Sequence, residues 1–188
     1  MKNDIQLCIE AYRRIKNLKL VGKELGIPWQ TVYVHLKSAN EPVMGDKLRY
    51  GSDRDKLASI AESVFKEIIP EATDRNKIKY QSSYDFDVFD YAVDVKASMP
   101  RQLNKKYQAK SWAFSFKKQN LLCDFICCFC FSENREIRHV LIVPSEFFKD
   151  LQTVSVSCDG YSKWLDYSVQ KEDVEPFFRS LPQKLKSA

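Results

Sequence analysis

The stretch of residues 84–98 constrains the fold of this chain more than any other, because apolar and charged side chains alternate along it with a period of two. Such alternation is typical of half-buried β-strands. A two-residue turn at Asp90 and Tyr91 would join two strands into a hairpin. The cross-strand neighbours expected from that turn are Val88 with Val93, Asp87 with Asp94, and Asp85 with Lys96.

One face of the expected hairpin is apolar, whereas the other carries three carboxylates and one ammonium. Like charges placed opposite each other on a sheet are destabilising. Lys96 alone is too little to balance Asp85, Asp87 and Asp94, and a divalent cation with oxygen ligands would supply the remaining positive charge. The alternation therefore predicts a cation site on this face. An ordinary solvated polar face is the alternative.

This order of an acid, a short hairpin and then acid-x-Lys resembles the core of the PD-(D/E)xK nucleases. The tripeptide Asp94-Val95-Lys96 matches the (D/E)xK element, and either Asp87 or Asp85 matches the preceding acid. The proline of the motif name is absent, while Ala97-Ser98 after the lysine is similar to the family. The resemblance covers roughly residues 51–148. It implies an α/β fold with a restriction-endonuclease-like central mixed β-sheet flanked by helices.

The resemblance also implies a role for the helix that precedes the hairpin. Ser52 is a suitable N-cap for this helix, and an apolar stripe runs along residues 57–68. Many nucleases of this family place a glutamate here that points at the metal, and Glu62 matches that position. Glu67 is the less favoured choice, and a simple solvated Glu62 is the alternative.

The chemistry implied by the resemblance is hydrolysis of DNA phosphodiester bonds with Mg²⁺, for which Mn²⁺ can substitute. Carboxylates would bind the metal, and the lysine would contact the phosphate and polarise the attacking water. The implied catalytic residues are Glu62, Asp85, Asp87, Asp94 and Lys96, and the four acids among them are the implied metal ligands. The sequence leaves the choice between Asp85 and Asp87 open.

The N-terminal part shows a different pattern, with three short amphipathic helices expected over residues 4–16, 18–25 and 29–37. Gly22 would let two of these helices cross closely, and Gly26-Ile27-Pro28 would form the turn between them. Ile27, Val32 and Leu36 would form a miniature core. This segment resembles a helix-turn-helix unit of the repressor and sigma-factor type, whose last helix enters the major groove.

We therefore expect three regions in the chain. Residues 1–40 would form a small all-α helix-turn-helix DNA-binding domain, and residues 51–188 a PD-(D/E)xK nuclease-like domain. Residues 41–50 have no clear period and contain proline and glycine, as is typical of a linker.

The charge distribution favours a polyanion as partner, and we expect that partner to be DNA. The formal net charge is +5, and residues 95–123 contain seven Lys or Arg and no acid. Glutamine can bond adenine, and lysine can bind phosphate or guanine. The candidate DNA contacts are Trp29, Gln30, Thr31, Tyr33 and Lys37, with Lys19 and Lys23 beside them, and Arg101, Lys105, Lys106 and Lys110 in the basic stretch. A three-helix module that binds protein is the alternative to DNA binding, and a place in the core is a separate alternative for Trp29.

No apolar run of about 18 residues is present, and the N-terminus lacks a signal-peptide apolar core. The six cysteines do not follow a disulfide framework. We therefore expect a cytoplasmic, intracellular protein with no membrane partner. Four crowded cysteines lack the paired spacing of a zinc site, and we expect buried free thiols at Cys123, Cys127, Cys128 and Cys130.

Together these patterns predict a metal-dependent DNA endonuclease that an N-terminal helix-turn-helix positions on its substrate. A homodimer would let an enzyme with one site per chain cut both strands. One alternative is a non-catalytic DNA-binding regulator with a degenerate nuclease-like domain. Another is a protein whose hairpin binds a structural cation and that has no affinity for DNA.

Overall fold

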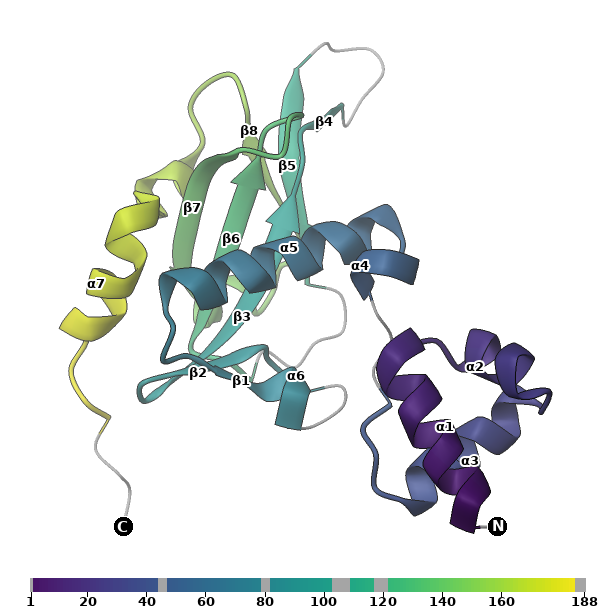
Figure 1. Cartoon of the computed structure of the whole chain (residues 1–188). Helices are drawn as coiled ribbons and strands as arrows, with labels where there is room; N and C mark the ends of the chain where they lie inside the picture. Colours follow the sequence, from purple (N-terminus) through teal and green to yellow (C-terminus); the bar gives the residue numbers. More distant parts are fainter. Residues whose placement is uncertain (1, 44–46, 79–81, 103–108, 117–121, 185–188) are drawn as a thin grey trace. The chain divides into compact units, whose positions relative to one another are not determined.

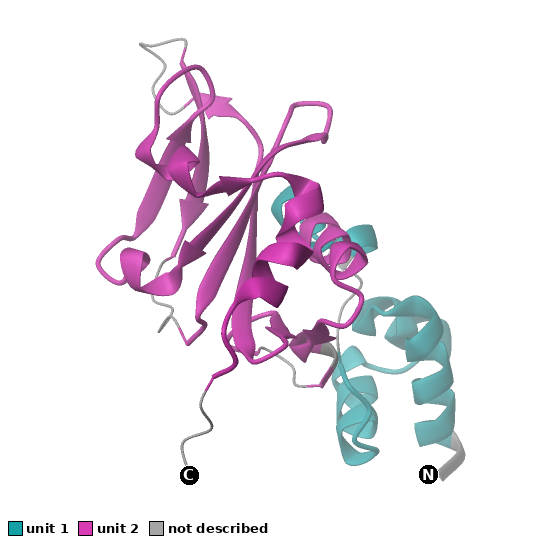
Figure 2. Cartoon of the chain, turned by 90° about the vertical axis from the view of Figure 1, so that its left-hand side faces the viewer, with its two compact units in different colours: residues 1–59 teal, residues 60–188 magenta. Residues whose placement is uncertain are grey.

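A computed structural model of the chain describes residues 2–43, 47–78, 82–102, 109–116 and 122–184. The chain divides into two compact units, Met1–Ser59 and Ile60–Ala188, which Figure 2 distinguishes by colour. The division falls inside helix α5 (Asp53–Ile68). Within the ranges just given, no helix combines the length and the apolar character needed to cross a bilayer.

The first unit has three short helices where the periodicity predicts them, followed by a shorter one. Their bounds are α1 (Lys2–Ile15), α2 (Leu18–Leu25), α3 (Trp29–Ser38) and α4 (Lys47–Tyr50). Asn17 caps α2, because its side-chain oxygen accepts the backbone N–H groups of Lys19 and Leu20. Gly26 ends α2 with a φ of 68°, a left-handed conformation that favours glycine.

Glycine is also required at Gly22, where the turn between α2 and α3 approaches the helix. A Cβ atom at this position would lie 2.7 Å from the backbone oxygen of Ile27, too close for any side chain. Val21, Val32 and Leu36 are fully buried around this contact, and Ile27 packs against them half-buried. The expected miniature core is therefore present, and buried side chains of α1 complete it.

The second unit is built on a six-stranded mixed sheet with the strand order β1-β2-β3-β6-β7-β9 (Figure 1). The strands are β1 (Thr73–Asp74), β2 (Phe86–Val88), β3 (Tyr91–Ser98), β6 (Phe125–Phe131), β7 (Ile137–Pro144) and β9 (Ser168–Val169). The β3–β6 pair is parallel, whereas the other described pairs of this sheet are antiparallel. This arrangement confirms the expected α/β class with a central mixed sheet.

Three of the described strands do not join the central sheet. They belong to a second, antiparallel sheet made of β4 (Arg101–Gln102), β5 (Lys110–Ser115) and β8 (Thr153–Ser157). Trp112 and Phe114 of β5 pack with Ile126 and Cys128 of β6 in one buried cluster. The indole of Trp112 also donates to the backbone oxygen of Phe131 at 2.7 Å, which ties the two sheets together.

Helices cover the opposite face of the central sheet. The ring of Phe65 on α5 lies 5.0 Å from the ring of Phe86 on β2 and 6.1 Å from that of Phe178. The remaining helical elements, with η for a 3-10 helix, are α6 (Arg75–Ile78), η1 (Ser145–Phe148), η2 (Lys163–Tyr167), η3 (Lys171–Asp173) and α7 (Val174–Ser180).

The central hairpin forms, but the expected turn at Asp90 and Tyr91 is wrong. The observed pairs are Val88 with Tyr91, Asp87 with Ala92, and Phe86 with Val93. Phe89 and Asp90 therefore form the turn, and Phe89 supplies the positive φ, 53°, that tight hairpin turns need. Tyr91 joins β3 as a result, where its ring packs 5.5 Å from that of Phe125.

This register differs from the expected one by two residues. A slip of two keeps every side chain on its expected face, because the side-chain period of a strand is two. The acidic face is therefore retained, but its cross-strand neighbours change. Asp87 pairs with Ala92 instead of Asp94, and Asp85 moves level with Asp94 instead of Lys96.

Candidate active site

Three of the predicted site residues converge where β2 begins, and β3 supplies two of them. Asp94 and Lys96 share one face of β3, while Val93 and Val95 point to the other. Asp85 is fixed by the backbone of β3: its N–H donates to the oxygen of Val93 at 3.1 Å, and its Oδ2 accepts the N–H of Val95 at 2.8 Å. Two carboxylates from adjacent segments thus lie beside one lysine.

Burial sets the charge states of this cluster. Asp94 is only 5% exposed, and burial raises its pKa to about 6, with Lys96 opposing the rise and Asp85 adding to it. Burial lowers the pKa of Lys96, but the attraction of Asp94 and Asp85 outweighs this effect, so its pKa lies above the ordinary value. At neutral pH the cluster therefore contains a buried carboxylate and a protonated lysine that form an ion pair.

One buried oxygen of Asp94 pairs with the lysine of its own strand. Oδ2 is buried, and no donor among the described residues reaches it with hydrogen-bond geometry, although the ammonium of Lys96 lies against it as an ion pair. A hard divalent cation such as Mg²⁺ binds such an oxygen, so the donor set of Asp85 and Asp94 fits this class of ion.

The two carboxylates do not make a complete protein cage for a metal. In the part of the chain that the structure describes, no three or more His, Cys, Asp or Glu side chains are grouped to hold an ion. Mg²⁺ commonly uses one or two carboxylates and takes its other ligands from water and substrate phosphate. The site therefore suits an ion that also binds a phosphate group.

Asn76 is a site residue that the sequence did not reveal. It lies on α6, and its side-chain amide donates to Oδ1 of Asp85 at 2.9 Å. The backbone N–H of Asn76 in turn donates to Oδ1 of Asp74 at 3.0 Å, which holds this turn in place. Both oxygens of Asp85 are thereby oriented. Residues 74–76 carry no periodic signal, and only their polar, turn-forming character hints at this role.

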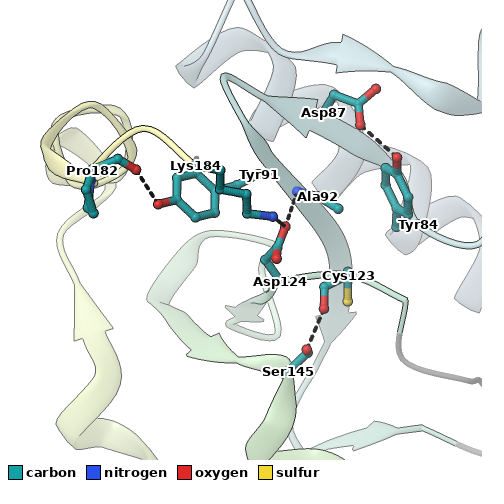
Figure 3. Close-up of polar contacts among 9 residues, drawn as sticks. All are labelled: Tyr84, Asp87, Tyr91, Ala92, Cys123, Asp124, Ser145, Pro182 and Lys184. Carbon is teal, nitrogen blue, oxygen red and sulfur yellow. Dashed lines mark hydrogen bonds and ion pairs between the residues drawn. The ribbon is translucent and has the colours of Figure 1, made fainter. Parts of the chain in front are cut away.

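Asp87 does not join the cluster, although it shares the acidic face of the hairpin. Its Oδ1 accepts the hydroxyl of Tyr84 at 2.8 Å, and its Oδ2 lies 3.2 Å from the guanidinium of Arg75 (Figure 3 shows the Tyr84 contact). Asp87 is also absent from the charges that act on Asp94. The register slip therefore favours Asp85 over Asp87 as the partner of Asp94.

Asp124 anchors the hairpin from the other side, as Figure 3 shows. Its Oδ2 accepts the N–H of Ala92 at 2.7 Å and forms an ion pair with Lys184 near the C-terminus. The hydroxyl of Tyr91 donates to the backbone oxygen of Pro182, and the ammonium of Lys184 lies 5.0 Å from the centroid of the Tyr91 ring, so this C-terminal segment contacts the strand as well as Asp124. These contacts fix the first residues of β3 and hence the position of Asp94.

Glu62 is half-buried on α5. It is not among the charges that shift the pKa of Asp94 or of Lys96. Its assignment as a metal ligand stays a prediction.

No family model matches the chain, and no curated protein matches it in sequence. Among solved structures, the chain is similar to a bacterial homing endonuclease, I-Ssp6803I, with 14% sequence identity and a TM-score of 0.45. The match covers 68% of this chain and 93% of that chain. A likeness at this level does not assign a function, so the side chains described above carry the proposal made below.

The candidate DNA contacts of the first unit lie at its surface. Trp29 is 42% exposed and Tyr33 39% exposed, so Trp29 is not a core residue. The ammonium of Lys37 lies 5.9 Å from the centroid of the Tyr33 ring. The other candidates there are exposed, apart from the half-buried Thr31, and comprise Gln30, Lys19 and Lys23.

The basic stretch of the second unit is described at residues 95–102, 109–116 and 122–123. Arg101 on β4 and Lys110 on β5 are exposed, and Lys110 forms an ion pair with Glu133. Lys105 and Lys106 lie outside the described residues. The four crowded cysteines are buried free thiols, and burial raises the pKa of Cys123 to about 12. They are therefore thiols at neutral pH.

Proposed function

We propose that this protein is a metal-dependent DNA endonuclease of the PD-(D/E)xK type. Asp85, Asp94 and Lys96 form its catalytic centre, and the first unit holds the DNA as a helix-turn-helix. The observation that supports this proposal is the buried carboxylate of Asp94, which lies beside a second carboxylate, Asp85, and pairs with a lysine of its own strand.

In the proposed reaction, the oxygen of a water molecule forms a bond to phosphorus, and the bond between phosphorus and one ester oxygen breaks. The departing oxygen takes up a proton, and the attacking water loses one. When bound, Mg²⁺ would stabilise charge on the phosphate and lower the pKa of the attacking water. Asp85 and Asp94 would hold the metal, while Asn76 keeps the carboxylate of Asp85 oriented.

Lys96 has a different role before and after the metal binds. Its raised pKa makes it an ammonium at neutral pH, and it neutralises Asp94 in the metal-free protein. About 20% of its side chain is exposed, so the flexible chain has room to turn toward solvent. A lysine that leaves Asp94 in this way would contact an oxygen of the scissile phosphate and stabilise charge there.

Cleavage of plasmid DNA with Mg²⁺ or Mn²⁺, with and without chelator, tests the proposal. We expect Asp85→Asn, Asp94→Asn and Lys96→Met to lower the rate by about two orders of magnitude or more, while DNA binding persists. Asp87→Asn is the matched control, because Asp87 lies on the same hairpin but contacts Tyr84 and Arg75, and it should cleave at the wild-type rate. Wild-type cleavage by Asp94→Asn, or cleavage that the chelator leaves unchanged, would refute the assignment.

Metal binding gives a second readout that does not require cleavage. Lys96 and a divalent cation compete for the same carboxylate, so Lys96→Met should bind Mn²⁺ more tightly than the wild type while cleaving less. Asp94→Asn should bind it more weakly. Calorimetric titration with Mn²⁺ separates these outcomes. Weaker Mn²⁺ binding in Lys96→Met would contradict the competition.

The DNA-binding role of the first unit needs its own test. Gln30→Ala and Lys37→Ala change exposed side chains at the start and end of α3 and should weaken binding to duplex DNA. Lys37→Ala should also reduce the dependence of affinity on salt, as expected for loss of a phosphate contact. Lys171→Ala, an exposed lysine of the second unit, should leave both quantities unchanged.

A second candidate function is a non-catalytic DNA-binding regulator with a degenerate nuclease-like domain. The observation that favours it is the lack of a third grouped metal-ligating side chain among the described residues. A regulator would bind DNA in a salt-sensitive manner and leave plasmid intact in both Mg²⁺ and Mn²⁺.

A further inference from the structure

A cavity of about 520 Å³ on the second unit is lined by none of the residues of the candidate active site. It lies between η1 and η2, and its volume is in the range of sites that bind small ligands or single side chains. Its aromatic lining residues are Phe147, Trp164 and Tyr167, and its acidic lining residues are Glu146, Asp150 and Asp166. We call it the aromatic cavity.

The rings of the aromatic cavity are held in place by the core of the unit. Trp164 stacks on Phe148 with 5.2 Å between ring centroids, and Phe148 stacks on Phe116 at 4.5 Å. Phe148 is only 1% exposed, so this stack reaches into the core between the two sheets. Tyr167 makes an edge contact with Phe147 at 5.7 Å. A ligand would therefore meet rings that are already ordered, which lowers the entropic cost of binding.

The charge of the aromatic cavity is opposite to that of the chain as a whole. Three exposed carboxylates line it against one lysine, Lys163, although the formal net charge of the chain is +5. No ion pair joins Glu146, Asp150 or Asp166 to any residue that the structure describes. The ammonium of Lys163 lies 5.0 Å from the centroid of the Trp164 ring, so this ring already attracts a cation. A polyanion such as DNA would be repelled here.

We propose that the aromatic cavity binds an arginine side chain from a basic segment of a protein partner. A guanidinium is planar, stacks on aromatic faces and donates to carboxylates through a fork of N–H groups, and this combination suits the rings and acids present. Phe147 and Leu151 also line the cavity, and they are 50% and 38% exposed, which offers apolar contact to the rest of a peptide. The charge complementarity selects a basic partner, and the proposal is independent of DNA cleavage.

The test uses the full chain and two short peptides with acetyl and amide ends. One peptide carries arginine, and the other carries citrulline, which has the same shape without the charge. The chain has three tryptophans, whose indole N–H signals are separable by NMR, and Trp164→Phe identifies the signal of Trp164. The arginine peptide should shift the Trp164 signal saturably and leave that of buried Trp112 unchanged. The citrulline peptide should bind at least about tenfold more weakly.

Variants that are expected to change the peptide affinity in opposite directions separate an effect on recognition from an effect on folding. The triple variant Glu146→Gln, Asp150→Asn, Asp166→Asn should lower the affinity about tenfold, whereas Glu172→Gln, an exposed acid outside the cavity, should not change it. Lys163→Ala should raise the affinity about two- to fivefold, because it removes the competing cation, and a damaged fold cannot produce that gain. Equal binding of both peptides, or no effect of the triple variant, overturns the proposal. Self-association that the triple variant abolishes would also overturn it and assign the cavity to a second copy of the chain.

Discussion

Lys96→Met is the most informative single substitution, because it removes the only described cation that pairs with Asp94 and keeps the volume of the side chain. In the wild type the pKa of Asp94 is about 6, against an ordinary value of 3.8. The folded chain thus holds this proton more tightly than the unfolded chain. Stability therefore falls as pH rises from about 4 to about 6, and above pH 6 the contribution of Asp94 is constant.

In Lys96→Met the free energy of unfolding continues to fall above pH 6, since Lys96 is the group that holds the pKa of Asp94 down. Each further pH unit costs up to about 1.4 kcal/mol, so the loss relative to the wild type reaches at most about 3 kcal/mol at pH 8. This agrees with the cost of about 3–5 kcal/mol for breaking a buried ion pair, reduced here because 20% of the Lys96 side chain is exposed. At pH 5 Asp94 is protonated in both proteins, and the difference should nearly vanish.

Urea unfolding in the presence of chelator measures the free energy of unfolding of both proteins at pH 5 and at pH 8. Tryptophan fluorescence is the signal, because Trp112 is buried in the same unit. Adding Asp94→Asn to Lys96→Met should remove the part of the pH dependence that Lys96→Met introduces, since residue 94 no longer titrates. Lys110→Met is the control: Lys110 is also in an ion pair, but it is exposed, so no pH-dependent loss is expected. Equal losses at both pH values, or no loss at pH 8, would show that Lys96 does not hold Asp94 ionised.

Three further predictions follow from single contacts. Asn76→Ala should lower Mn²⁺ affinity about 10- to 100-fold in calorimetry while the chain stays folded, because Asp85 loses the amide that orients it; unchanged affinity would remove Asn76 from the site. Gly22→Ala should destabilise the first unit by about 1–3 kcal/mol in thermal unfolding, since its Cβ would lie 2.7 Å from the oxygen of Ile27, and a wild-type melting curve would contradict that packing. Ser98→Ala should cost about 1–3 kcal/mol in urea unfolding, because the buried Oγ of Ser98 accepts the N–H of Ala113 at 2.9 Å; Ser115→Ala, at an exposed position, should cost far less.

The period of the side chains predicted the acidic face of the hairpin, but it did not predict the register. Alternation says which face each residue occupies, and a slip of two residues leaves every face unchanged. The choice between the two turns depends on contacts made far along the chain. Tyr91 joins β3 because its ring packs on Phe125 and its hydroxyl reaches Pro182, and neither contact is visible in the local pattern.

The first three helices and the central hairpin could be predicted because they carry strong local signals: apolar periodicity, the turn at Gly26-Ile27-Pro28 and the alternation of residues 84–98. Which strands share a sheet could not be predicted in this way. Trp112 lies on β5 and Val156 on β8, and both strands show the alternation of an ordinary half-buried strand. These two strands pair with each other and do not join the central sheet. Asn76 was missed for a related reason, because an isolated polar residue in a turn gains its role only from the carboxylate that folding brings to it.

Strand β3 has hydrogen-bonded neighbours along both edges, β2 on one side and β6 on the other. Amide protons of such an interior strand exchange with solvent mainly when the whole domain opens. Asp94 and Lys96 therefore lie on one of the least mobile segments of the second unit. Surface loops can then lengthen, shorten or change composition without displacing these two side chains. Changes in the loops over the course of evolution would therefore leave the charged pair in the same position.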